Sequence, residues 1–201
     1  MSVSDVGAAY DERAAEYVEL FGSLDQLVEA DRALVDRWRD STSGRLLDAG
    51  CGPGQWTEIL RQGAREVLGV DLSEQFLTVG RRRRPTVPFL RASLAALPLR
   101  SGTVGGVLAW YSVIHTSPDA LPSLLAELRR VLRSDGSLVL GFVDGDSGQS
   151  FDHTVITAYS WSVDAMSSLL DDAGFEVVEH HQRPPVGRRS RAHAALVARA
   201  R

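Results

Sequence analysis

The residues with the clearest chemical potential lie in a glycine-rich turn and at the end of the apolar run that follows it. Residues 46–54 read Leu-Leu-Asp-Ala-Gly-Cys-Gly-Pro-Gly, and a second apolar run ends in Gly69-Val70-Asp71. The spacing of about twenty residues between the turn and Asp71 is typical of a nucleotide-binding βαβ unit. Glycines let the backbone approach a ligand closely, and one carboxylate can accept hydrogen bonds from both ribose hydroxyls. We therefore expect Asp71 to anchor the ribose of an adenosine cofactor.

The spacing of the glycines distinguishes two kinds of cofactor. Dinucleotide-binding turns read Gly-x-Gly-x-x-Gly, whereas Gly50, Gly52 and Gly54 are spaced Gly-x-Gly-x-Gly and follow Asp48. A carboxylate at Asp48 would repel a pyrophosphate but suit a ligand that carries an ammonium and a sulfonium. The turn resembles that of the class I S-adenosylmethionine-dependent methyltransferases, in which it holds the methionine portion of the cofactor. The resemblance spans roughly residues 5–199 and implies S-adenosylmethionine as the cofactor.

The resemblance also implies which residues surround the cofactor. In this family a Tyr-Asp-x-x-Ala-x-x-Tyr segment, here residues 10–17, often closes over it. Ser93 stands where many relatives have an aspartate that contacts the adenine amino group, and its hydroxyl can accept that hydrogen bond more weakly. The expected cofactor-binding residues are Tyr10, Tyr17, Asp48, Gly50, Gly52, Gln55, Trp56, Asp71, Leu72, Ser93, Leu94, Ala109 and Tyr111.

Candidates for catalysis and for acceptor binding follow the apolar run 104–110 and lie in the C-terminal third. Tyr111 can stack on the adenine or orient a substrate, or it fills the edge of the core. His115 is the first candidate for accepting a proton from an acceptor hydroxyl, and the alternative is a structural histidine. We predict His115 and Tyr111 as catalytic residues, and His115, His153, Tyr159 and Arg183 as substrate-binding residues.

Arginines form two clusters of different expected character. The run Arg81 to Arg84 ends a predicted helix just before Pro85, where cations suit the helix dipole, and we expect a solvated helix end. Arginines 183, 188, 189 and 191 surround the connection of a predicted C-terminal hairpin. They could grip an anionic acceptor bidentately, or the connection is an ordinary polar loop.

Composition excludes several classes of function. The 201 residues are 44% hydrophobic with a formal net charge of −4, which predicts one core and indicates neither a general nucleic-acid surface nor a membrane span. The chain has no lysine and no asparagine. It therefore lacks a lysine Schiff base, the Asn-Pro-Pro-Tyr motif of amino-methylating DNA and glutamine methyltransferases, and the lysine tetrad of ribose 2′-O-methyltransferases. Cys51 is the one cysteine, so no intrachain disulfide is possible. We expect a cytoplasmic protein without a metal site.

The elements that must position these residues alternate between helix and strand. Periodicity predicts helices over 6–20, 24–38, 56–62, from 73 to the arginine run, across the leucines 121–132, and over 162–173. It predicts strands over 45–49, 66–71, 88–92, 104–110, 137–142, 175–181 and 192–199. Together they predict an α/β fold with a mostly parallel sheet and helices on both faces. The resemblance implies that this sheet is Rossmann-like and seven-stranded, with the last two strands forming a hairpin and the last strand antiparallel. We expect one domain over 1–201, with an N-terminal helical cap (1–43), a cofactor-binding core (44–143) and a C-terminal loop, helix and strand hairpin (144–201).

The resulting hypothesis is a small-molecule methyltransferase, a monomer or homodimer, that acts by in-line displacement on an oxygen, nitrogen or carbon acceptor. The acceptor could be anionic, and nucleic acid is an unfavoured partner. Three alternatives remain at this point: an RNA methyltransferase that uses the arginine clusters, a non-catalytic S-adenosylmethionine-binding module, and an NAD-linked oxidoreductase. The glycine spacing and Asp48 disfavour the last of these.

Overall fold

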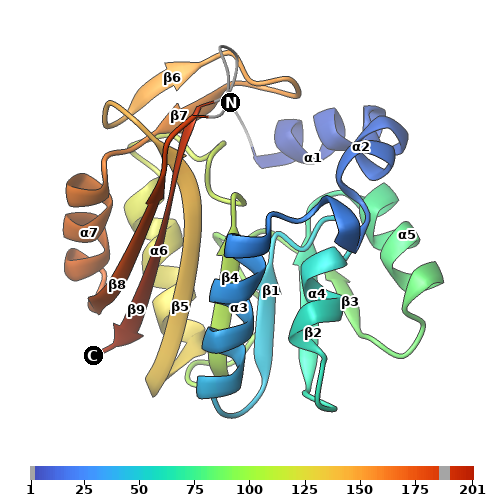
Figure 1. The fold of residues 1–201 in the computed structure, drawn as a ribbon, viewed down its shortest axis with the longest axis horizontal. Helices are drawn as coiled ribbons and strands as arrows, with labels where there is room; N and C mark the ends of the chain where they lie inside the picture. Colours follow the sequence, from blue (N-terminus) through green and yellow to red (C-terminus); the bar gives the residue numbers. More distant parts are fainter. Residues whose placement is uncertain (1–2, 186–190) are drawn as a thin grey trace.

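A seven-stranded sheet forms the centre of the computed structural model, which describes residues 3–185 and 191–201 (Figure 1). Its order is β3-β2-β1-β4-β5-β9-β8, and β1 to β5 are parallel whereas β9 is antiparallel to both of its neighbours. The expected α/β fold with an antiparallel last strand is therefore confirmed. The strands are β1 (Leu46–Ala49), β2 (Val67–Asp71), β3 (Phe89–Arg91), β4 (Val104–Trp110), β5 (Leu132–Asp144), β8 (Phe175–Arg183) and β9 (Ala192–Ala200).

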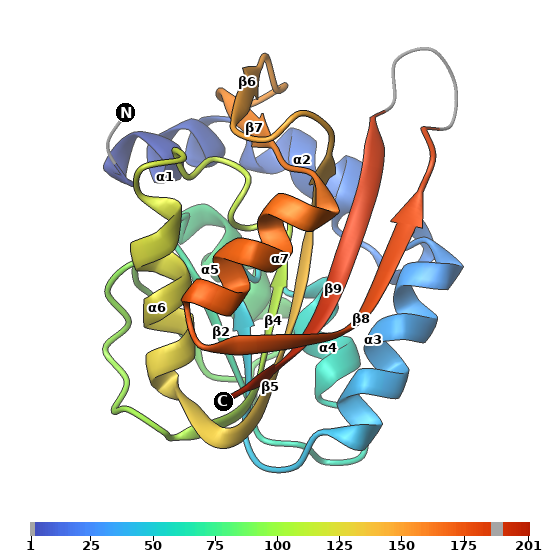
Figure 2. The same cartoon turned by 90° about the vertical axis from the view of Figure 1, so that its left-hand side faces the viewer.

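Helices cover both faces of the sheet because successive strand residues point to opposite faces (Figure 2). Leu46 of β1 packs in the core formed with α3 (Glu29–Ser41) and α4 (Gln55–Leu60). Its neighbour Leu47 belongs to the core on the other face, with α6 (Leu121–Val131) and α7 (Val163–Asp172). Helix α5 (Glu74–Arg83) packs against β2 and β3, and Ser73 caps it by accepting a hydrogen bond from the Phe76 N–H at 3.1 Å, as predicted.

The carboxyl ends of the parallel strands lie beneath two small groups of elements (Figure 1). One group is α1 (Val3–Glu12), α2 (Ala14–Phe21) and the 3₁₀ turn η1 (Leu24–Gln26). The other is a two-stranded sheet of β6 (Gln149–Phe151) and β7 (Ala158–Ser160). Strand order reverses between β1 and β4, and in open α/β sheets ligands bind at such a point.

The N-terminal helices differ from the prediction. The helix expected over 6–20 is interrupted at Arg13 (φ −110°, ψ 11°), whose guanidinium donates to the Thr154 carbonyl. The helix expected over 24–38 is η1 followed by α3, since Val28 between them is extended (φ −67°, ψ 129°). In both places tertiary contacts outweigh helix propensity.

Further differences concern strands and arginines. β5 begins at Leu132, which pairs with Val104, whereas the strand was expected to begin at residue 137. β6 and β7 were not predicted, because a strand of three residues is too short to show a recognisable alternation of apolar and polar residues. Arg84 is not solvated: its side chain is 10% exposed, pairs with Glu58 and donates to the Pro53 carbonyl at 3.1 Å. In α6, Pro122 occupies the first turn.

Within the described residues, no helix combines the length and apolar character needed to span a bilayer.

Candidate functional site

Backbone contacts hold the glycine turn after β1 against β2 and β4. Gly50 has φ +78°, and its N–H donates to the Val70 carbonyl at 2.8 Å. A Cβ at Gly50 would overlap the Cβ of Ser112 in the segment that leaves β4, and positive φ disfavours residues with a Cβ. Gly52 (φ +53°) donates its N–H to Oδ2 of Asp71 at 2.8 Å. The turn therefore places its backbone beside the carboxylate predicted to hold a ribose.

Asp71 is oriented by the backbone on both sides of its carboxylate. Its Oδ1 accepts a hydrogen bond from the Ser73 N–H at 2.9 Å, and its Oδ2 accepts the one from Gly52. Burial raises the pKa of Asp71, and these backbone hydrogen bonds oppose the rise. Each oxygen keeps capacity for a further hydrogen bond, as a pair of ribose hydroxyls requires.

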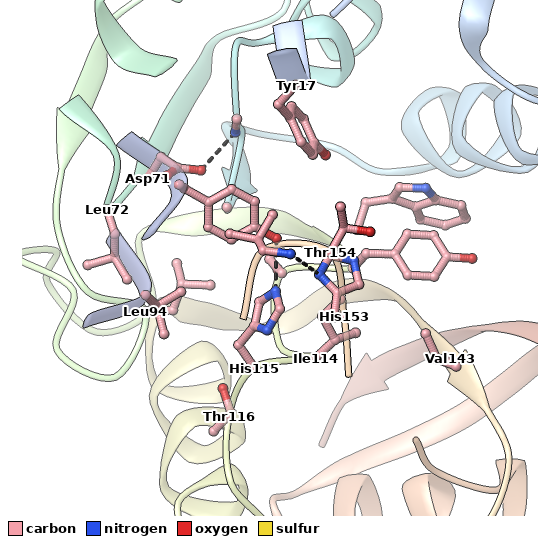
Figure 3. A pocket seen from close by; sticks show the side chains of 18 of the residues that line it. Tyr17, Asp71, Leu72, Leu94, Ile114, His115, Thr116, Val143, His153 and Thr154 are labelled. Carbon is pink, nitrogen blue, oxygen red and sulfur yellow. Dashed lines mark hydrogen bonds between the residues drawn. The ribbon is translucent and has the colours of Figure 1, made fainter. Parts of the chain in front are cut away.

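A cavity of about 860 Å³ lies above this turn, large enough for a nucleoside and a small acceptor together (Figure 3). We call α1 and α2 the cap, because residues of both helices line the cavity. The cofactor side of the cavity consists of Gly50, Gly52, Gln55, Trp56, Asp71, Leu72, Ser93, Leu94 and Ser112. The hairpin side consists of Asp31, Tyr111, Arg183, Arg191 and His193.

The cap is joined to the core by a tyrosine–histidine pair. The Tyr10 hydroxyl lies 2.8 Å from Nε2 of His115, and Nδ1 of His115 lies 2.9 Å from the Thr157 carbonyl oxygen. Because a carbonyl oxygen can only accept, Nδ1 carries the proton and Nε2 accepts from Tyr10. Burial lowers the pKa of His115, and the bond to Thr157 opposes this. His115 is thus neutral with both ring nitrogens occupied.

Further contacts hold the cap against α5 and against the loop after β6. Oδ1 of Asp11 accepts from the Ser73 hydroxyl at 2.5 Å and from the Gln75 N–H at 3.1 Å. Arg13 reaches across to the carbonyl of Thr154, in the segment between β6 and β7. The cap therefore bridges the N-terminal end of α5 and the loop after β6.

The hairpin side contains a second tyrosine–histidine pair. The Tyr111 hydroxyl lies 2.8 Å from Nδ1 of His193, and their ring planes meet at 87°. Arg183 donates to Asp31 of α3 at 2.8 Å, so the hairpin β8–β9 is tied to α3 beside this pair. Arg191 lies over the Phe151 ring at 3.7 Å. Polar groups here come from four separate elements.

A family model described as "Methyltransferase domain" matches residues 46–136, which contain the glycine turn, Asp71 and Tyr111. The chain belongs to the class I S-adenosylmethionine-dependent methyltransferases. The curated relatives include a malonyl-[acyl-carrier protein] O-methyltransferase of Enterobacter lignolyticus, 35% identical over 142 residues, 71% of this chain and 55% of the relative. A probable S-adenosylmethionine-dependent methyltransferase of Mycobacterium tuberculosis is 32% identical over 137 residues, 67% of this chain and 49% of the relative. The chain thus spans about half the length of these relatives.

Solved structures extend the likeness of fold over nearly the whole methyltransferase chain. The [4+2]-cyclase SpnF superposes with a TM-score of 0.80 at 19% identity, covering 99% of this chain and 97% of the cyclase. At that identity the likeness shows the fold alone.

Two buried polar atoms on the cofactor side fit the methyltransferase cofactor. Oε1 of Gln55 and Oγ of Ser112 have no hydrogen-bond partner within the described part of the chain, and both residues line the cavity. Buried polar atoms are normally satisfied, and S-adenosylmethionine offers ammonium, carboxylate and hydroxyl groups for them. The methyl donor of this family is S-adenosylmethionine.

The cavity brings together most of the predicted site residues. Those that line it are Tyr10, Tyr17, Gly50, Gly52, Gln55, Trp56, Asp71, Leu72, Ser93, Leu94, Tyr111, His115, His153 and Arg183. Asp48, Ala109 and Tyr159 do not line it. Ala109 is fully buried in β4, and Tyr159 lies in β7, where its N–H donates to the Ile114 carbonyl at 2.8 Å. Arg188 and Arg189 fall outside the described residues.

Asp48 lies behind the cavity lining and is fully buried. Its Oδ2 accepts a hydrogen bond from the Thr57 hydroxyl at 2.5 Å. Burial raises the pKa of Asp48 to about 7, with the Thr57 bond opposing and the Asp71 charge adding to the rise. In this structure Asp48 links β1 to α4, and its predicted role toward the cofactor stays a prediction.

Other predicted residues have partners of their own within the protein. Oγ of Ser93 accepts from the Ala95 N–H at 3.1 Å. His153 packs edge-on against His115, with ring centroids 5.1 Å apart. Burial, and secondly the charge of a protonated His115, lower the pKa of His153 to about 4. His193 and Ser112 were not predicted. No local motif marks His193, whereas Ser112 directly follows the predicted Tyr111.

Proposed function

We propose that the chain is an enzyme that transfers a methyl group from S-adenosylmethionine to a small-molecule acceptor. The observation that carries the proposal is one cavity with a cofactor side built on the glycine turn and Asp71 and, opposite, a polar hairpin side. When bound, S-adenosylmethionine supplies an electrophilic methyl group on a sulfonium. Asp71, Gln55 and Ser112 would hold the cofactor, while Tyr111 and the hairpin side would orient the acceptor.

Most of the catalytic work we assign to the protein is positioning. An in-line displacement needs the acceptor atom close to the methyl carbon and opposite to sulfur, with water excluded. The cap supplies exclusion of water, since Tyr10 bonds to His115 in the segment after β4 and Arg13 bonds to Thr154 in the loop after β6. Trp110, which lines the cavity next to Tyr111, supplies an apolar aromatic surface for the acceptor, and its ring plane is tilted by 56° from that of Trp56 on the cofactor side.

Two properties of the cavity bear on the kind of acceptor: the charge of its lining and its volume. Arg183, the expected anion receptor, is already paired with Asp31. An anionic acceptor would therefore depend on Arg191, which lines the same cavity and lies over Phe151. A cavity of about 860 Å³ supports a small molecule over RNA. We propose that the protein is cytoplasmic and is a monomer or a homodimer. The free thiol of Cys51 agrees with a reducing compartment.

The [4+2]-cyclase SpnF shares this fold, so the fold alone does not establish the reaction and a direct test is needed. We would titrate the purified protein calorimetrically with S-adenosylmethionine, S-adenosylhomocysteine and NAD, and then screen acceptors with labelled methyl donor. We expect both sulfur nucleotides to bind and NAD not to bind. Binding of NAD alone refutes the proposal, and cofactor binding without methyl transfer across the screen favours a binding module.

The same screen separates RNA from a small acceptor. RNA binding that releases counterions weakens steeply as salt rises, whereas binding of a small neutral acceptor does not. We expect acceptor binding to change little between low and physiological salt, and a steep decline would favour the RNA methyltransferase.

A further inference from the structure

The two tyrosine–histidine pairs of the cavity differ in their capacity to accept a proton. His115 donates from Nδ1 to Thr157 and accepts at Nε2 from Tyr10, so both nitrogens are occupied. A proton that reached its ring by way of Tyr10 could not pass on to water from Nδ1, which is bonded to the Thr157 carbonyl, and the imidazolium would form in a buried site beside the His153 ring. This pair is suited to fastening the cap.

Tyr111 connects the two sides of the cavity, since its side chain bonds to His193 and the next residue belongs to the cofactor side. It follows β4 at the point where the strand order reverses, and the next residue, Ser112, packs against Gly50 of the glycine turn. Its backbone has φ +55°, a conformation that is strained for a residue with a side chain and recurs at functional sites. Its N–H donates to Gly141 of β5 at 2.9 Å, which holds that conformation. The fold thus fixes the backbone of Tyr111 in the cavity lining, directly before the residue that packs on the glycine turn.

His193 completes the pair from β9. Its Nδ1 faces the Tyr111 hydroxyl, and no hydrogen bond to its Nε2 occurs among the described residues. Arg183 of β8 and Asp31 of α3 are the charged groups that act on it, with opposite effects. Burial and Arg183 lower the pKa of His193, so the ring is neutral at physiological pH, and in the Nε2–H tautomer the lone pair of Nδ1 accepts the hydrogen bond from Tyr111. A proton taken at Nδ1 can be released from Nε2 to water.

We propose, resting on the methyltransferase function above, that Tyr111 and His193 form a proton relay for an aromatic hydroxyl acceptor. The planar acceptor lies against Trp110, whose ring meets that of Tyr111 at 89°, and its hydroxyl donates to the Tyr111 oxygen.

Every bond and proton of the relay is accounted for. As the acceptor oxygen forms a bond to the methyl carbon, the carbon–sulfur bond breaks and its electron pair stays on sulfur. The acceptor proton passes to the Tyr111 oxygen while the Tyr111 proton passes to Nδ1 of His193. His193 becomes imidazolium, the cofactor product is neutral at sulfur, and water then takes the proton from Nε2.

The first test reads the tautomer of His193 by long-range ¹H–¹⁵N correlation on labelled protein, assigned by the signal lost in His193→Gln. The relay requires that neutral His193 carries its proton on Nε2 and that Tyr111→Phe shifts its Nδ1 resonance. Because this test needs no acceptor, a proton found on Nδ1 overturns the relay whatever the enzyme methylates.

The second test compares phenol with 4-nitrophenol as acceptors of labelled methyl. The substitution His193→Gln isolates proton uptake, since the new amide oxygen still accepts a hydrogen bond from Tyr111 but takes no proton. We expect His193→Gln to lower kcat for phenol about 100-fold or more with KM unchanged. The loss is much smaller for 4-nitrophenol, which is largely ionised already. His181→Gln, in the same hairpin but outside the cavity lining, is the matched control and retains activity.

The outcomes separate the relay from the proposed function. Equal losses on both phenols, or none on either, overturn the relay. Wild-type protein that binds S-adenosylhomocysteine but methylates neither phenol overturns the aromatic hydroxyl acceptor and leaves the cofactor assignment standing. Wild-type protein that binds no sulfur nucleotide refutes the proposed function itself.

Discussion

The cofactor side and the hairpin side of the same cavity are held in place by different kinds of bond. On the cofactor side, Asp71 bonds to the backbone N–H groups of Gly52, 19 residues earlier, and Ser73, two residues later. On the hairpin side, side chain bonds to side chain across the fold, as in Tyr111 with His193 and Arg183 with Asp31. The N–H groups that orient Asp71 are present whatever side chains the turn carries, whereas each pair on the hairpin side depends on two particular side chains. If the two sides bind cofactor and acceptor as proposed, the hairpin side is the one that single substitutions can change more readily.

Replacing Asp71 should produce the largest effect, and it should be confined to the cofactor side. Asp71→Asn exchanges a charged acceptor for a neutral amide, and we expect affinity for S-adenosylhomocysteine to fall by about 2 to 4 kcal/mol. Calorimetric titration measures this. Asp164→Asn, on the exposed first turn of α7, is the control and should bind normally. Unchanged affinity in Asp71→Asn would remove the ribose anchor from the site.

A pair of glycine variants tests whether the turn is built by backbone geometry. Gly50→Ala meets both positive φ and overlap with Ser112, while Gly52→Ala meets positive φ alone. We expect Gly50→Ala to destabilise the fold by about 2 to 3 kcal/mol and Gly52→Ala by about 1 kcal/mol. Urea unfolding gives both values. If the two variants are equally stable, contact with Ser112 does not constrain the turn.

The cap should respond to loss of a single hydroxyl. Tyr10→Phe removes the hydrogen bond to Nε2 of His115 and leaves a buried acceptor unsatisfied, at a cost of about 1 kcal/mol. Urea unfolding and the dissociation rate of S-adenosylhomocysteine measure the effect, and we expect faster release. Release at the wild-type rate would show that this bond does not retain the cofactor.

The smallest effect is expected where two partly exposed partners meet on the hairpin side. Arg183→Gln breaks the ion pair with Asp31, both of whose side chains are partly exposed, and should cost less than about 1 kcal/mol of stability. Affinity for S-adenosylhomocysteine should remain at the wild-type value. A large loss of cofactor affinity in this variant would contradict the independence of the two sides.

The cofactor side could be predicted because its signal is local. A strand, a glycine turn and an acid lie within residues 46–71, and the bonds they make, such as Gly52 to Asp71, join residues close in the chain. Periodicity predicted the strands and helices of the sheet for the same reason. Resemblance to a known family supplied the direction of the last strand, which spacing alone does not determine.

The hairpin side could not be predicted in the same way. His193 lies within an alternating strand, and its partnership with Tyr111 depends on β9 pairing between β5 and β8. The break at Arg13 and the occupied lone pair of His115 likewise depend on contacts with Thr154 and Tyr10, far along the chain. These are consequences of tertiary assembly, and no window of neighbouring residues contains them.

The bonds of the cap have a consequence for the order in which the chain is built. Tyr10 and Arg13 find their partners 105 and 141 residues later, at His115 and Thr154. During synthesis the cap therefore leaves the ribosome before its partners and is among the last elements to dock, because contacts of such separation must wait for the intervening sheet. The cofactor side of a nascent chain is therefore exposed before the cap can close over it, so S-adenosylmethionine has access to the cavity before the cap is in place.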